Sequence, residues 1–186
     1  KTTPSPVLPK QQQDCQELML ASGGSSHYLS CFYESMRRPT YRTYPLGRWK
    51  KLKGRPAKAV LDAMTFADFV GVVEFSSIAT TYAGLTTLAR AMPDFKTTLS
   101  EFIDGFYASG GTYMAEGFER AFKLVDDSKV KNYEAGCHTT YVLVTDGEWS
   151  ETDQDPTTAI TTRQSTHTDE HFFVVGLGDG VGESAL

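Results

Sequence analysis

The stretch DFVGVVEF, residues 68–75, decides the fold class. A short, continuous apolar run that is rich in valine predicts a strand buried on both faces, as in a parallel sheet. Similar runs predict three more strands, at HYLSCFY (27–33), TTYVLV (139–144) and HFFVVGL (171–177), and a short edge strand is predicted at ATTYAG (79–84).

Segments with helical spacing separate these strands. Apolar residues recur on one face from Trp49 to Met64, in DFKTTLSEFIDGF (94–106) and in YMAEGFERAFKLV (113–125), and DPTTAITTRQS (155–165) is a weaker helix. Pro56 stands in the first turn of the main segment of its helix, or it kinks a longer helix. The alternation predicts an α/β fold: a doubly wound, Rossmann-like, mostly parallel sheet with helices on both faces.

The chain suits one domain preceded by an arm. Residues 1–14, KTTPSPVLPKQQQD, combine prolines with a glutamine run and have no apolar period, so we interpret them as an extended arm or linker. Residues 15–186 are long enough to bury a sizeable core and are expected to form the globular domain.

Charge and hydropathy argue against two classes of function. A formal net charge of −5 and a pI near 5.4 give no electrostatic footprint for nucleic acid. No apolar run is long enough to span a membrane. Basic residues gather locally between positions 37 and 58, either as a solvated face or as a partner-binding loop whose candidates are Arg37, Arg38, Arg42 and Arg48.

Three polar positions are expected at the carboxyl edge of the sheet, where folds of this class bind ligands. Ser35 follows the first strand, Thr112 opens a helix behind two glycines, and Asp146 stands just past an apolar strand. Two simpler interpretations stay open. Thr112 is a plain helix cap whose hydroxyl accepts from the amide of Ala115 or a neighbour, and Asp146 is a turn residue.

Taken together, these segments resemble the von Willebrand factor type A domain. VVEFSS, ASGGTYMAEGFERAF and YVLVTDGE are similar, in order, to its second strand, its threonine loop and its aspartate loop. ELMLASGGSSHYLSCFYESM and VVGLGDGVGESAL are similar to the group that pairs this domain with a Cache domain, as the calcium-channel alpha-2-delta subunits do. The family fold closes with a further helix. We therefore keep the alternative that residues 15–186 form a domain that lacks its last helix and strand.

The resemblance implies a metal-ion-dependent adhesion site whose first loop departs from the family pattern. When Ser35 and Met36 are laid on the family's Ser-Gly-Ser-Met, Cys31 stands where an aspartate belongs and Tyr33 where a serine belongs. The remaining candidate ligands, followed by two acidic helpers, are Ser35, Thr112, Asp146, Glu34 and Glu148.

The replaced loop is a poor ligand set for a hard cation. Mg²⁺ and Ca²⁺ prefer oxygen ligands, whereas cysteine is soft and tyrosine does not mimic a short serine hydroxyl. We therefore expect a degenerate site without a metal cofactor; a weak Mg²⁺ or Ca²⁺ site is the alternative.

The cysteines indicate in which cellular compartment the chain is expected. Cys31 is expected at the carboxyl end of its strand, whereas Cys137 precedes a strand and belongs at the opposite edge, too far away to bond. Cys15 can reach that edge, so Cys15 with Cys137 is the disulfide hypothesis. A disulfide implies an extracellular or lumenal setting; the alternative is a subunit of an intracellular assembly.

These observations favour a non-enzymatic protein-interaction module, within a membrane-anchored parent protein or a larger complex. The first alternative is a structural or scaffold subunit that docks without metal. The second is a cysteine-based enzyme that uses Cys31, which is disfavoured because a cysteine within a strand is usually buried and inert.

Overall fold

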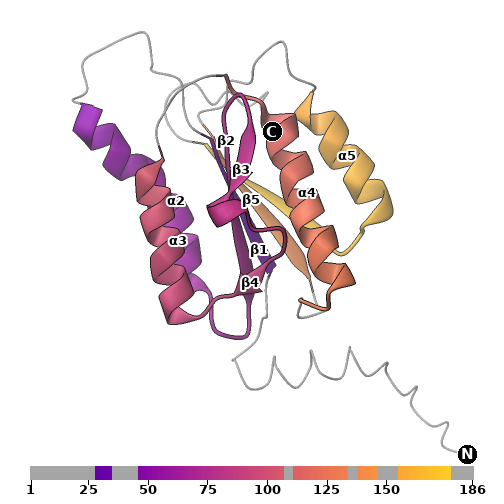
Figure 1. Cartoon of the computed structure of the whole chain (residues 1–186). Helices are drawn as coiled ribbons and strands as arrows, with labels where there is room; N and C mark the ends of the chain where they lie inside the picture. Colours follow the sequence, from indigo (N-terminus) through magenta and orange to yellow (C-terminus); the bar gives the residue numbers. More distant parts are fainter. Residues whose placement is uncertain (1–27, 35–45, 107–110, 134–137, 146–154, 177–186) are drawn as a thin grey trace, which may run out of the picture.

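The computed structural model describes residues 28–34, 46–106, 111–133, 138–145 and 155–176, with the backbone alone over 28–34 and 46–53. Strands and helices alternate along the chain, and the helices lie on the two sides of one central sheet (Figure 1). None of the helices in the described ranges combines the length and apolar character needed to cross a membrane.

The sheet is mixed but mostly parallel. Its longer strands are β1 (Tyr28–Glu34), β2 (Phe69–Phe75), β5 (Thr139–Thr145) and β6 (Glu170–Gly176). Two short strands, β3 (Ala79–Thr81) and β4 (Ala89–Arg90), both pair antiparallel with β2. The main order is β3-β2-β1-β5-β6, in which β1 pairs in parallel with both β2 and β5.

The helices form a layer on each face of the sheet. Helices α2 (Leu46–Ala63) and α3 (Pro93–Gly105) share one apolar cluster with Val70 and Val72 of β2. Helix α4 (Met114–Val130) shares the other cluster with Phe69, Val73 and Phe75 of β2, and α5 (Pro156–Thr166) contributes Ile160 to it. Successive residues of β2 therefore face opposite layers, which explains why its sequence is apolar throughout.

Gly71 of β2 lies against Leu124 of α4. A Cβ atom at this position would stand 2.4 Å from Cδ2 of Leu124, closer than packed carbon atoms come. A glycine inside a strand often marks such a close approach, and here it sets the distance between β2 and α4.

Most of the predicted elements are confirmed, with four differences. Helix α2 begins at Leu46, before Trp49, and contains Pro56, so the longer-helix alternative is correct. Strand β4 and the short 3₁₀ turn Tyr82–Gly84 were not predicted. Among the described strands β6 lies at the sheet edge, and Phe173 on it is 59% exposed, so the expectation of burial on both faces is wrong there.

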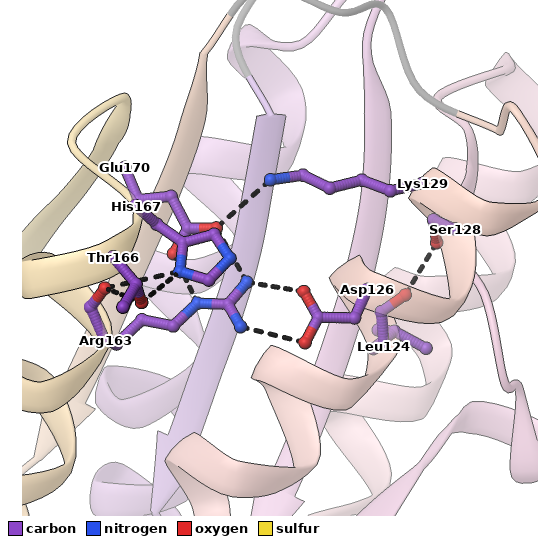
Figure 2. Close-up of polar contacts among 8 residues, drawn as sticks. All are labelled: Leu124, Asp126, Ser128, Lys129, Arg163, Thr166, His167 and Glu170. Atoms are coloured by element: carbon purple, nitrogen blue, oxygen red, sulfur yellow. Dashed lines mark hydrogen bonds and ion pairs between the residues drawn. The ribbon is translucent and has the colours of Figure 1, made fainter.

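A buried ionic cluster fastens α4, α5 and β6 at the amino edge of the sheet (Figure 2). The Arg163 guanidinium donates to both carboxylate oxygens of Glu170 at 2.7 Å each, and to both of Asp126 at 2.6 and 2.8 Å. Lys129 adds a bond of 3.3 Å to Glu170, and the guanidinium carbon of Arg163 lies 5.0 Å from the ring centre of Phe122. Arg163 thus links three elements through one side chain.

The two acids of this cluster differ in burial. The Glu170 side chain is fully buried, whereas that of Asp126 is 48% exposed. Burial raises the pKa of Asp126, but the hydrogen bonds and charge of Arg163 outweigh it and leave that pKa below the ordinary aspartate value. The ionised Asp126 carboxylate therefore stabilises the folded state at pH values above the ordinary aspartate pKa. This stabilisation is lost as the pH falls through the lowered pKa of Asp126.

We expect Arg163→Ala to destabilise the domain by about 3–5 kcal/mol, because it leaves a fully buried carboxylate with one lysine as its remaining cation. Asp126→Ala is the matched control and is expected to cost at most about 1 kcal/mol, since its carboxylate is half exposed. Urea unfolding followed by circular dichroism measures both. Equal losses for the two variants would contradict the assignment of Glu170 as the buried charge that requires Arg163.

Candidate functional site

The strand order singles out one place on the sheet for ligand binding. From β1 the chain continues to β2 on one side, while β5 and β6 occupy the other side. The order therefore reverses between β1 and β5, and in open α/β sheets ligands bind outside the carboxyl ends of the strands at such a reversal. The two strands end at Glu34 and Thr145. This edge, which we call the switch-point edge, is the candidate site.

Thr112 is held at this edge by the turn that follows β2. The backbone N–H of Gly111 donates to the Ser77 hydroxyl at 2.8 Å, and that of Tyr113 donates to the Ser76 carbonyl at 2.9 Å. Both serines come directly after Phe75, the last residue of β2, whose register partner on β1 is Glu34. Thr112 itself is only 4% exposed. The loop is thus fixed on both sides of Thr112, beside the end of β1.

The first turn of α4 is locked to the same region. The Glu116 carboxylate accepts the backbone N–H of Ala79, the first residue of β3, at 3.2 Å. A Cβ atom on Gly117 would lie 2.9 Å from the Phe75 ring, so only glycine lets the helix approach this closely. The amino end of α4 therefore has little freedom to move away from the end of β2.

The helix-cap interpretation of Thr112 stays a prediction. Helix α4 begins at Met114, and the cap position is Tyr113, whose side chain makes no capping hydrogen bond. Thr112 lies one residue before the cap.

Two of the remaining candidate residues have a described backbone position. Glu34 is the last residue of β1 and lies at the switch-point edge. Arg48 lies near the start of α2. The other predicted ligands, basic-loop residues and cysteines lie outside the described residues: Ser35, Asp146, Glu148, Arg37, Arg38, Arg42, Cys15 and Cys137.

Cys31 is not at the carboxyl end of its strand, contrary to the expectation. It pairs with Val72 on β2 and with Val142 on β5, in the middle of the ladder. Tyr33 is also a ladder residue and pairs with Glu74 and Val144. The strand continues past Cys31, since Tyr33 pairs with both β2 and β5 and Glu34 pairs with β2. The polar residues that follow Cys31 therefore did not mark the end of the strand.

Sequence reasoning missed the residues that hold the Thr112 loop. Ser76 and Ser77 were noticed only as the end of a strand motif, and Glu116 only as part of a helix. A signal was available for the serines, because polar residues directly after a buried parallel strand must lie at its carboxyl edge. No local pattern connected Glu116 to the amide of Ala79, which lies 37 residues away in the sequence.

Comparison with known proteins places this geometry in a family. The sequence profile of the von Willebrand factor type A domain matches residues 57–186. The chain belongs to the von Willebrand factor type A family. This agrees with the resemblance seen in the sequence, and the described part of this von Willebrand A domain has the alternating helices and strands of that fold.

One relative in sequence is the human voltage-dependent calcium channel subunit alpha-2/delta-2. It is 31% identical over 88 residues, which cover 47% of this chain and 8% of that subunit. The matched part is thus a small fraction of the channel subunit's length.

Two solved structures show the fold alone, because their identities are low. A von Willebrand factor type A protein from Catenulispora acidiphila has a TM-score of 0.61 at 19% identity, covering 84% of this chain and 34% of its own. Proximal thread matrix protein 1 from the mussel byssus has a TM-score of 0.63 at 18% identity, covering 87% of this chain and 38% of its own.

We expect Ser77→Ala to loosen the Thr112 loop, because the Gly111 N–H then loses its acceptor, a loss of about 1 kcal/mol. Hydrogen exchange at the Gly111 amide is expected to become faster. Ser165→Ala is the control, since Ser165 is an exposed residue of α5 whose hydroxyl donates to Thr162. Unchanged exchange at Gly111 in the Ser77 variant would contradict the proposed anchoring of the loop.

Proposed function

We propose that this chain is a non-catalytic protein-interaction module that recognises its partner at the switch-point edge. The single observation that carries the proposal is the anchored Thr112 loop, which Ser76 and Ser77 hold beyond the carboxyl end of β2, the strand that pairs with β1. A rigid edge of this kind reduces the entropy lost on binding. Domains of this family are usually non-catalytic, which agrees with the proposal.

The proposal includes a weakened or lost divalent-metal site. Residues 31 and 33, which stand where the family has an aspartate and a serine, are Cys31 and Tyr33. Both pair inside the sheet ladder, so neither belongs to a loop beyond the strand end. The remaining candidate oxygens come from Ser35, Thr112 and Asp146, with Glu34 and Glu148 as acidic neighbours in the sequence. Such a reduced set favours recognition that does not depend on Mg²⁺ or Ca²⁺.

The partner is proposed to be a protein on the extracellular or lumenal side of a membrane. The similarity to a calcium-channel subunit supports this setting. A disulfide between Cys15 and Cys137, detected by peptide mapping without reductant, would add support. Both cysteines found reduced in such material would favour the intracellular alternative.

Calorimetric titration with Mg²⁺ and with Ca²⁺ tests the metal part of the proposal. We expect no saturable heat for the unaltered chain, because two of the family's oxygen ligands are absent. Saturable binding that is lost in Thr112→Val or Asp146→Ala would contradict the proposal. Thr97→Val is the matched control, since Thr97 lies on α3 and its hydroxyl donates to Pro93.

Substitution at the edge tests where partners bind. Ile78 lies in the turn after β2 and is 63% exposed, and Val130 ends α4 at the opposite edge and is 84% exposed. We expect Ile78→Asp to reduce capture of cell-surface proteins from the source tissue, and Val130→Asp to leave it unchanged. Capture is measured by mass spectrometry with Mg²⁺ and with a chelator, which should give the same result. Equal capture by both variants would point to the scaffold alternative, in which docking uses another face.

A further inference from the structure

The second feature of chemical interest lies at the amino edge of the sheet, away from the switch-point edge. His138 directly precedes β5, and His171 is the second residue of β6. The two strands pair in parallel, with Thr140 opposite His171. The ring centres of His138 and His171 are 5.7 Å apart, with a tilt of 49° between the ring planes. Both side chains are exposed.

The alternation of the strands places both rings on the same face of the sheet. Val142 of β5 and Val175 of β6 both belong to the apolar cluster under α2 and α3. Side chains two residues apart in a strand share a face. His171 therefore shares the face of Val175, and the backbone leading into β5 puts His138 on the face of Val142.

This spacing suits shared coordination of one metal ion. With metal–nitrogen bonds of about 2.1 Å, two imidazoles on one tetrahedral ion have ring centres roughly 5 Å apart. Small side-chain rotations bring a pair at 5.7 Å to that separation. Imidazole is a ligand for zinc, copper and nickel and not for magnesium or calcium. We propose that His138 and His171 chelate a transition-metal ion of this class across β5 and β6.

The chelate would fasten an edge strand. Among the described strands, β6 is the last in the sheet order, next to β5. Within the described residues no third histidine, cysteine, aspartate or glutamate joins the pair as a ligand. Water therefore fills the remaining positions of the ion. A ligand present at 100 times its Kd raises the folding equilibrium constant about 100-fold, so the metal stabilises the sheet at this edge.

Calorimetry with Ni²⁺ and Zn²⁺ on the intact chain tests the proposal, with Mg²⁺ as the hard-ion control. We expect one saturable site for Ni²⁺ and Zn²⁺, lost in both His138→Ala and His171→Ala. His167→Ala is the matched control and should bind as the unaltered chain does, because its Nδ1 lies within hydrogen-bonding distance of the Thr166 hydroxyl and the Arg163 carbonyl oxygen. Binding should weaken at acidic pH, since protons compete for the imidazole nitrogens.

Two further measurements separate this site from other metal ligands. In an NMR titration with Ni²⁺, the ring signals of His138 and His171 should broaden together before that of His167. Cys137 is adjacent to His138 in the sequence, so Cys137→Ser is included and should keep the site. Binding that survives in His171→Ala, or that is lost in Cys137→Ser, would overturn the two-histidine assignment. Because both histidines are exposed, circular dichroism of the alanine variants should show an unchanged fold.

Discussion

The parallel pairing of β1 between β2 and β5 is the constraint on which the rest of the structure depends. Its register aligns Glu34 with Phe75 on one side and Tyr33 with Val144 on the other. The carboxyl ends of three strands consequently meet at one edge of the sheet. The strand order reverses between β1 and β5 at this edge. Helix α4 begins at this edge and leads the chain back toward the start of β5. The Thr112 loop, which directly precedes α4, therefore lies at the same edge.

The two edges of the sheet are stabilised in different ways. At the amino edge, the charges of Arg163, Glu170 and Asp126 fasten α4 and α5 to β6. At the carboxyl edge, backbone amides bonded to Ser76, Ser77 and Glu116 hold the Thr112 loop. Charged side chains thus hold the amino edge, and hydrogen bonds to backbone amides hold the described part of the carboxyl edge.

The sequence predicts the elements well and their alignment less well. Apolar runs and helical spacing located β2, β5, α3 and α4, because burial on both faces or on one stripe leaves a direct trace in the sequence. The register, that is, which residues of neighbouring strands pair, cannot be recognised from such a pattern. Cys31 was expected at the carboxyl end of its strand, yet Tyr33 and Glu34 continue the ladder beyond it. Arg163 was read as part of a weak helix, and only the tertiary contacts with Glu170 and Asp126 explain its burial.

The central claim is that this von Willebrand A domain keeps an anchored recognition edge while its metal site has been weakened or lost. Crystals grown with Mn²⁺ and measured at the manganese absorption edge test it most directly, because the anomalous signal reports the ion alone. We predict no anomalous peak near Thr112, and an ordered Thr112 loop bonded to Ser76 and Ser77. A strong peak within bonding distance of the Thr112 hydroxyl would contradict the claim and restore a metal-dependent mode of recognition.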